Sequence, residues 1–512
     1  MKIFVLFAPR FLEWPLAIAH RLSETKNISI MGLATGTRDV FERVSASSDP
    51  VISPLDFLDD LERQWLSTPF DEKRARRHEK RLGPGITGRI ITADRQVGIG
   101  LVGGGVIPET SLIKITKDFE MIRRYVGGLL GYFFDILESN KPDLVLCYGV
   151  AGSVALSLSQ VAGCLNIPFR MFMHARIGGR RIIDDSPKNI GLLAPAGATF
   201  EKALNNPLML AHALPEARRY LEQFRSKTVP PDYMFFHQKA LKKKLQYKSI
   251  FSNATKDLAR VVYRLLRRPV MPLRSVSPWA LFKHNFLTSI RARGLIKDSL
   301  FVKPEELPKA GFAYFPLHME PEASTMVIAP MHSNQMAIIE ALAKSLPLDM
   351  YLLVKEHTPM LGLRPKGFYE RLSRIPRVFL ASPYMDSASL IKKAALTCVI
   401  TGTAAWEAIL LEKPALIVGD SPFLAIGEGY VHCRDVTKLP WAIDKAINLA
   451  PVGDERLTLY LAALFDQSFD FPRESFWGDV TEDTVSENPE ILDNICKRLM
   501  NSCSGQDCGN EK

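Results

Sequence analysis

The sequence predicts an α/β protein made of two doubly wound lobes that face a cleft. Two regions alternate buried apolar strands with helices, a strongly basic segment separates them, and 512 residues suffice for two or three domains. Hydrophobic residues make up 47% of the chain and charged residues 23%, which excludes a largely disordered polypeptide. No three- or seven-residue period runs through the chain, so collagen-like and coiled-coil folds are excluded as well.

The first predicted lobe spans residues 1–225. Its expected elements are a strand at 3–7, a helix at 12–22, a basic surface loop at 71–95, a long helix at 112–139, and a strand, helix and strand at 144–148, 149–163 and 167–172. The uncharged run 144–169 is long enough to span a bilayer, but its glycines, its polar residues and Pro168 favour a soluble core. The apolar start of the chain is too short for a signal-peptide core and is expected to be a buried strand.

Residues 226–310 are predicted to be a basic connector. Within it, residues 239–309 hold 17 Lys or Arg and 4 Asp or Glu, a local +13 against +10 for the whole chain. This charge predicts attraction to something anionic, and nucleic acid, a lipid surface and phosphorylated small molecules all remain open. One hypothesis is peripheral binding to anionic bilayers; the other is a solvated connector that contacts only protein.

The second predicted lobe spans residues 311–450, followed by helices over 451–500 and a disordered tail over 501–512. Strands are expected at 312–315, 350–354, 378–380, 396–400 and 415–418, and helices at 335–344, 368–373, 387–394 and 404–411. The seven cysteines show no C-x-x-C pair and no zinc spacing, which indicates reduced thiols and a cytoplasmic setting.

The most informative motif is Thr401-Gly402-Thr403, which follows a buried strand and opens a helix. Such a turn directs backbone N–H groups, hydroxyls and the positive end of a helix at one spot, which suits a phosphate. Glu407 lies one helical turn further on and is a candidate for hydrogen bonds from ribose hydroxyls. The alternative is that Thr401 merely caps the helix.

Two further polar clusters follow strands of the same lobe. Lys355, Glu356 and His357 come after the expected strand at 350–354, and His318 and Glu322 come after the first strand of the lobe. Because the ends of parallel strands meet at one crevice, these side chains are expected to gather there. A solvated loop and an ordinary turn are the alternatives.

Five motifs occur in a fixed order. They are F-P-L-H-x-x-P-E-A-S-T from residue 315, V-K-E-H from 354, G-x-R-x-x-x-F-Y from 362, T-G-T-x-x-x-E-A from 401 and K-P-x-L-I-V-G from 413. Over about residues 311–425, roughly a fifth of the chain, this order resembles the bacterial capsule polysaccharide biosynthesis family, which includes Kdo transferases. The family often has Pro directly after the His, whereas here Thr358 precedes Pro359.

The resemblance implies a GT-B-like glycosyltransferase with two Rossmann-like lobes. Such an enzyme would move Kdo or another sugar from a CMP-, UDP- or GDP-linked donor onto a capsular polysaccharide or a lipid-linked acceptor. Carried over, the residues that would bind the nucleotide sugar are His318, Glu322, Lys355, Glu356, Thr401, Gly402, Thr403 and Glu407, and His357 would join the catalytic set. No D-x-D pair is present, which favours transfer without a metal, and no cofactor is expected.

The acceptor hydroxyl needs a general base, expected from the first lobe. Candidates are Glu13, Asp184 and Asp185, while Arg176 and Arg180 are candidate clamps on an anionic acceptor. Two other functions remain open. A nucleic-acid-binding protein would use the basic segment, although no recognised module is present, and a non-catalytic polysaccharide-assembly or export factor would keep the fold without the chemistry. The expected location is the cytoplasm, with attachment to the inner face of the membrane as a further hypothesis.

Overall fold

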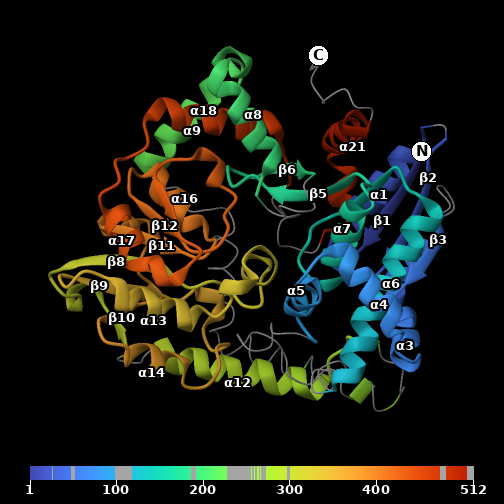
Figure 1. Cartoon of the computed structure of the whole chain (residues 1–512), viewed down its shortest axis with the longest axis horizontal. Helices are drawn as coiled ribbons and strands as arrows, with labels where there is room; N and C mark the ends of the chain where they lie inside the picture. The colour runs from blue at the N-terminus through green and yellow to red at the C-terminus, as the bar shows by residue number, and fades with distance from the viewer. Residues whose placement is uncertain are drawn as a thin grey trace.

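The computed structural model describes residues 1–25, 27–47, 52–97, 118–185, 192–227, 272–296, 300–472 and 480–503, with isolated positions between 255 and 266. These residues form two α/β lobes, each built around a seven-stranded sheet (Figure 1). The prediction of two doubly wound lobes is confirmed.

The first sheet has the strand order β14-β6-β5-β4-β1-β2-β3. Its strands are β1 (Lys2–Phe7), β2 (Ser29–Ala34), β3 (Ile52–Phe57), β4 (Leu144–Cys147), β5 (Phe169–His174), β6 (Arg180–Asp184) and β14 (Ser468–Asp470). The strands from β3 to β5 are parallel, whereas β6 runs antiparallel to β5 and β14. Reading from β3 to β6 gives the order 3-2-1-4-5-6, which is the Rossmann order.

Helices cover both faces of this sheet. They are α1 (Glu13–Ser23), α2 (Arg38–Ser45), α3 (Leu58–Ser67), α4 (Glu72–Leu82), α5 (Ile86–Ala93), α6 (Phe119–Asn140), α7 (Ser153–Cys164), α20 (Glu482–Ser486) and α21 (Pro489–Cys503). Apolar side chains spaced along one side of α6, among them Leu130, Phe134 and Leu137, are buried in the core.

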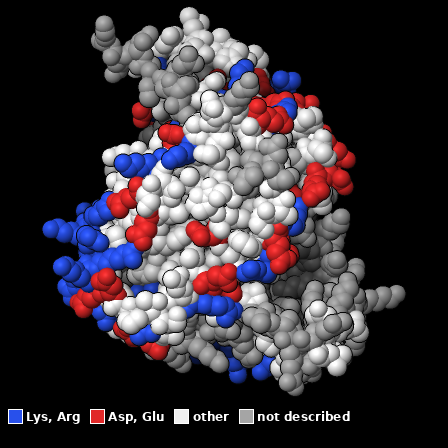
Figure 2. Space-filling view, turned by 90° about the vertical axis from the view of Figure 1, so that its right-hand side faces the viewer, with Lys and Arg blue, Asp and Glu red and all other residues white. Residues whose placement is uncertain are grey.

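The expectation of a surface loop over 71–95 is wrong, because this stretch forms α4 and α5. Asp71 caps α4 by accepting a hydrogen bond from the backbone N–H of Arg74. The cations of α4 lie toward solvent, whereas His78 is buried and stacks on Phe134 at 4.3 Å. Figure 2, which looks onto the first lobe, shows Lys and Arg gathered along one edge of that face. The sequence pattern did not predict α4 because most of its residues are charged and few apolar residues mark the helical period.

The second sheet has the order β13-β12-β11-β8-β9-β10-β7, and all its pairings are parallel. Its strands are β7 (Phe301–Val302), β8 (Gly311–Pro316), β9 (Met350–Lys355), β10 (Val378–Ala381), β11 (Leu396–Val399), β12 (Ala415–Ile417) and β13 (Tyr430–His432). Its helices are α13 (Gln335–Ser345), α14 (Phe368–Ser373), α15 (Ser387–Lys393), α16 (Thr403–Leu410) and α17 (Leu439–Ile447). The expected strands and helices of this lobe all occur; the edge strands β7 and β13 were not foreseen.

The chain crosses between the lobes more than once. The helices α8 (Ala194–Asn205) and α9 (Leu214–Lys227) pack against α18 (Asp454–Gln467) and share an apolar core with the second lobe. After α18, β14 rejoins the first sheet and α21 packs on α1. The predicted boundary at residue 225 falls inside α9, and by packing α8 and α9 belong with the second lobe. The boundary itself stays a prediction.

One contact between the lobes involves a helix of the first and a short segment of the second. The helix α5 packs against residues 324–328 of the second lobe, where Val327 enters the apolar core of the first. The helix α12 (Pro278–Ile296) runs along the lower edge of the molecule in Figure 1. Most of the predicted connector before α12, and residues 504–512 of the predicted tail, lie outside the described residues. Among the residues that are described, no helix is both long and apolar enough to cross a bilayer.

Candidate functional site

The strand order of the second sheet marks one point for a ligand. From β8 the sheet continues through β9 in one direction and through β11 in the other, so the order reverses between β8 and β11. In open parallel sheets, ligands bind outside the carboxyl ends of the strands at such a reversal. The segments that leave β8 and β11 carry His318 and Thr401, both of which are buried.

His318 and the Thr401 turn meet directly across this reversal. The backbone N–H of Thr401 points at Nε2 of His318 at 3.5 Å, which requires that ring nitrogen to be unprotonated. Burial, together with the nearby Arg364, lowers the pKa of His318 to about 4, so the imidazole is neutral at physiological pH. A Cβ atom on Gly402 would lie 3.3 Å from Cε1 of the same ring, and glycine lets the turn pass this close.

The hydroxyl of Thr401 is buried, and no described residue forms a hydrogen bond with its Oγ1 atom. A buried hydroxyl without a partner costs free energy, so such atoms usually indicate a ligand or a water. The turn leads straight into α16, which begins at Thr403. The alternative, in which Thr401 merely caps this helix, is wrong, because the N-cap is Gly402 and no side chain caps the helix.

A second group of polar side chains lies beside this turn. The Nζ atom of Lys355, the last residue of β9, donates to Oγ of Ser387 at 3.1 Å. Burial lowers the pKa of Lys355, while Asp386 and Glu407 oppose that change. Thr403 forms a side-chain hydrogen bond with Glu407, so the group is continuous with the start of α16.

Glu407 is the carboxyl group of this cluster whose ionisation is most altered. Desolvation raises its pKa to about 7, the hydrogen bond from Thr403 opposes the rise, and the negative charge of Asp386 adds to it. Near neutral pH the carboxyl group therefore exchanges between a form that donates a hydrogen bond and one that only accepts. Either form suits a sugar hydroxyl, which can accept as well as donate.

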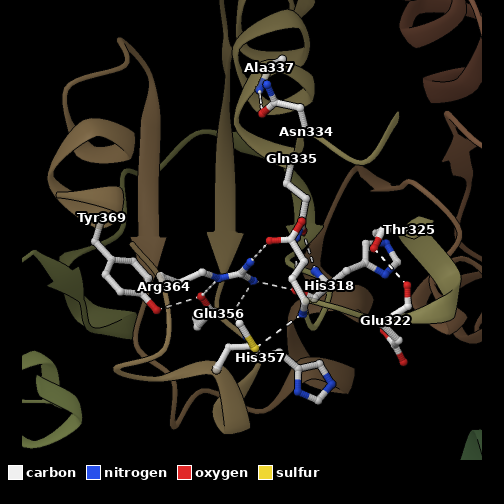
Figure 3. Close-up of polar contacts among 12 residues, drawn as sticks. His318, Glu322, Thr325, Asn334, Gln335, Ala337, Glu356, His357, Arg364 and Tyr369 are labelled. Atoms are coloured by element: carbon white, nitrogen blue, oxygen red, sulfur yellow. Dashed lines mark hydrogen bonds and ion pairs between the residues drawn. The ribbon is translucent and has the colours of Figure 1, made fainter. Parts of the chain in front are cut away.

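Glu356 and Arg364 form a buried ion pair behind the site (Figure 3). Nε and Nη2 of Arg364 lie 2.8 and 3.0 Å from the two carboxylate oxygens of Glu356, and Tyr369 donates to the same carboxylate at 2.8 Å. Arg364 also donates to the backbone oxygen of His318 at 2.6 Å and forms an ion pair with Glu320. Through Arg364, Glu356 therefore holds the ends of β8 and β9 together. Because Arg364 and Tyr369 already bind its carboxylate, these contacts favour a structural role over the predicted contact with the nucleotide.

The ring of His357 points away from Arg364 in Figure 3. Its backbone N–H donates to Oε1 of Glu356 at 2.6 Å, so the ion pair also fixes the direction in which the chain leaves β9. The side chain is partly exposed. A catalytic or nucleotide-binding role for His357 stays a prediction.

The acceptor-side candidates lie in the first lobe and are not all together. Glu13 is held by Arg43 through two hydrogen bonds of 2.8 and 3.0 Å. Asp184 is fully buried at the end of β6, whereas Asp185 is exposed just beyond it. Of the three candidate bases, Asp185 is the one whose carboxylate reaches solvent beyond a strand end.

The two candidate clamps differ in what they contact. Arg180 donates to Oγ of Ser468 at 2.8 Å and to Asp470 at 2.9 Å, so it fastens β14 to β6. Arg176 lies two residues after the end of β5 and has a positive φ of 62°. Burial raises the pKa of Glu322, and the charge of Arg176 opposes that rise. Arg176 thus brings a first-lobe strand end to the segment after β8, whereas Arg180 is engaged in the sheet.

Several residues of the site have no role in the sequence-based prediction. Asp386 caps α15 through the backbone N–H of Ser389, and Ser387 follows it as the partner of Lys355. The signal was available, because Asp386 follows the strand at 378–381 as the other clusters follow theirs. Arg364 and Tyr369 are the R and Y of the G-x-R-x-x-x-F-Y motif, and only the fold shows that they hold Glu356.

No protein-family model and no curated protein matches this chain. Solved structures that resemble it include UDP-GlcNAc 2-epimerase of Methanocaldococcus jannaschii, with 13% identity over 91% of this chain and 99% of the other, at a TM-score of 0.27. The enzyme of Neisseria meningitidis gives 13% identity over 91% and 98%, at 0.24. The β-Kdo 2,7-transferase KpsC of Thermosulfurimonas dismutans gives 12% over 70% and 88%, at 0.30. Similarity this low does not define a function.

Proposed function

We propose that this protein is a glycosyltransferase that binds a nucleotide sugar in its second lobe and transfers the sugar to a saccharide or lipid-linked acceptor held by the first lobe. The observation that carries the proposal is the unpartnered, buried hydroxyl of Thr401 at the strand-order reversal, directly before α16. A donor phosphate placed there would accept hydrogen bonds from the hydroxyl and from the first N–H groups of α16. It would also lie at the positive end of the helix dipole.

The remaining groups fit the rest of a nucleotide sugar. Lys355 supplies a positive charge beside the phosphate position, and Glu407 is suited to a ribose or sugar hydroxyl. During transfer, the acceptor oxygen bonds to the anomeric carbon, the bond from that carbon to the phosphate oxygen breaks, and a base takes the proton of the acceptor. The departing phosphate gains negative charge, which the helix start and Lys355 stabilise.

The first lobe supplies the base in this proposal. Among Glu13, Asp184 and Asp185, the preferred candidate is Asp185, because its carboxylate is exposed. Arg176 is the preferred contact for an anionic acceptor, since Arg180 is bound to β14. Transfer without a metal and a cytoplasmic location belong to the same proposal.

Binding of CMP, UDP and GDP by thermal shift tests the donor site. A nucleotide at about one hundred times its Kd stabilises the folded state by about 2.7 kcal/mol. We expect one of the three to raise the melting temperature of the wild-type protein and of Lys393→Gln, an exposed lysine on α15, but not that of Lys355→Met. If all three nucleotides leave the wild-type protein unchanged, the donor-site assignment fails.

A second measurement separates an enzyme from a non-catalytic factor with the same fold. The assay uses donor sugars that are linked to the nucleotide found to bind, and it follows hydrolysis or transfer of the sugar. A protein that binds the nucleotide but turns over none of these donors, with or without saccharide acceptors, would be the assembly factor rather than the transferase.

A further inference from the structure

The helix α12 has an unusual distribution of side chains between its two faces. Trp279, Phe286 and Ile290 are 57%, 41% and 50% exposed, whereas Ala280, Thr288 and Ala292 are buried. Three large apolar side chains of α12 therefore point away from the protein, whereas the residues that pack toward it are Ala280, Thr288, Ala292 and, near the end of the helix, Leu295. This is the reverse of a helix that merely covers a soluble core.

The outward residues form one continuous stripe. Trp279, Lys283, Phe286 and Ile290 are spaced by four, three and four residues, which places them on one side of a helix. Phe282 stacks between Trp279 and Phe286, with ring centroids 5.4 and 6.0 Å away. The outward face thus carries three stacked aromatic rings, and Lys283 lies among them in the sequence.

The position of α12 is fixed from both lobes. Gly362 of the second lobe has φ 79°, and a Cβ atom there would lie 2.3 Å from the backbone oxygen of Thr288. The G of the G-x-R-x-x-x-F-Y motif is thus a point of close backbone contact between α12 and the second lobe. Four residues before α12 begins, Arg274 forms ion pairs with Glu62 and Asp94 in the first lobe, at 2.7 and 3.2 Å. The stripe is therefore held rigidly outward.

Charge identifies the kind of partner. Residues 258–297 contain nine Lys or Arg and no Asp or Glu, and α12 itself contributes Lys283, Arg291 and Arg293. An acidic protein surface would match the positive charge, and a neutral one would match the apolar stripe. An anionic bilayer matches both features. Aromatic and aliphatic side chains enter the boundary between headgroups and acyl chains, while Lys and Arg contact the headgroups.

We propose that the outward face of α12, namely Trp279, Phe282, Lys283, Phe286 and Ile290, docks this protein onto an anionic lipid bilayer. The helix lies in the plane of the membrane surface and does not cross it. In the proposed function, this would bring a lipid-linked acceptor close to the first lobe. The docking surface itself does not depend on that function, because none of its residues belongs to the donor site.

Co-sedimentation with vesicles tests the proposal. The wild-type full chain is expected to bind vesicles of phosphatidylcholine mixed with phosphatidylglycerol, to bind pure phosphatidylcholine weakly, and to dissociate as NaCl is raised. The double variant Trp279→Ser/Lys283→Gln should bind the mixed vesicles at least about tenfold more weakly, since a single cation near the surface accounts for about fivefold.

The chain offers a closely matched control. Trp441 on α17 is 72% exposed, and Lys445 lies four residues further on, as Lys283 does after Trp279. Trp441→Ser/Lys445→Gln should bind the mixed vesicles like the wild type. Both variants should keep the wild-type melting temperature and the wild-type response to nucleotides, which separates a failure of this proposal from a failure of the donor site.

Three results would overturn the proposal. The first is equal binding of the α12 variant and the wild type to the mixed vesicles. The second is equal binding of the wild type to neutral and anionic vesicles. The third is a wild-type dimer that the α12 variant converts to a monomer while vesicle binding stays unchanged, because the stripe would then be a contact between two copies of the chain.

Discussion

Replacing Thr401 by valine should make the unliganded protein more stable and its nucleotide binding weaker. The substitution keeps the shape of the side chain and removes the hydroxyl. Oγ1 of Thr401 is buried, and no described residue forms a hydrogen bond with it. Leaving such a group unpaired costs about 1–3 kcal/mol, so removing it should return about 1 kcal/mol to the folded state. The melting temperature of the unliganded variant should rise by about 1 °C if the 512 residues unfold together, and by about 2–4 °C if a single lobe unfolds by itself.

Nucleotide affinity should change in the opposite direction. A hydrogen bond to a charged group such as a phosphate contributes about 1.5–3 kcal/mol, so Kd should rise by about tenfold to a hundredfold. Isothermal titration with the nucleotide that stabilises the wild type gives this Kd, and differential scanning calorimetry of the unliganded protein gives the stability. An opposite sign in the two measurements is the signature of a hydroxyl reserved for a ligand.

Thr397 provides the control for this experiment. It lies in β11, four residues before Thr401, and its Oγ1 is likewise buried without a hydrogen bond to any described residue. Thr397→Val should raise the stability in the same way but leave Kd unchanged, because this residue lies inside the strand. The reasoning is refuted if Thr401→Val also leaves Kd unchanged, or if it destabilises the protein while Thr397→Val stabilises it.

Three further predictions concern charges of the site. Lys355→Met, which keeps the volume of this buried side chain, should lower the transfer rate about a hundred- to a thousandfold in a turnover assay, because the departing phosphate loses its cation. For Glu407, whose pKa rises from 4.5 to about 7, the stability gained is present below about pH 4.5 and is lost as the pH rises through 7. Because part of Glu407 is exposed, this loss is at most about 3 kcal/mol. When the unfolding free energy from urea titrations is plotted against pH between about pH 5 and 8, it should fall less steeply for Glu407→Gln than for the wild type. Arg364→Met should cost about 3–5 kcal/mol of unfolding free energy in the same assay, since the buried carboxylates of Glu356 and Glu320 would lose their cation, whereas the exposed Arg371→Met should cost little.

Much of the second lobe could be predicted from sequence because its strands are local features. Runs such as Met350–Lys355 and Leu396–Val399 are apolar, short and bounded by turns, and a fully buried parallel strand requires that pattern. The placement of Lys355 and Thr401 at strand ends also follows from the chain alone. What they contact does not, because Ser387 reaches Lys355 from the start of α15 and His318 reaches Thr401 from the segment after β8.

The first lobe was harder to predict because several of its elements depend on contacts with distant parts of the chain. The helix α4 is almost entirely charged, and its few buried contacts, such as His78 on Phe134, appear only when α6 is in place. The strand β14 joins β6 across nearly 290 residues of sequence, through Arg180 and Ser468, and no local pattern announces a pairing of that range.

The sequence by itself determined the fold class, the order of the strand-end motifs and the excess of positive charge. Each of these depends on residue type and spacing. Tertiary structure alone decided which strands are neighbours, and hence that the order reverses between the segments of His318 and Thr401. It also decided that Glu356 is occupied by Arg364, and that Trp279 and Phe286 face outward. Partners, burial and direction arise from contacts between distant parts of the chain, and a linear pattern does not contain them.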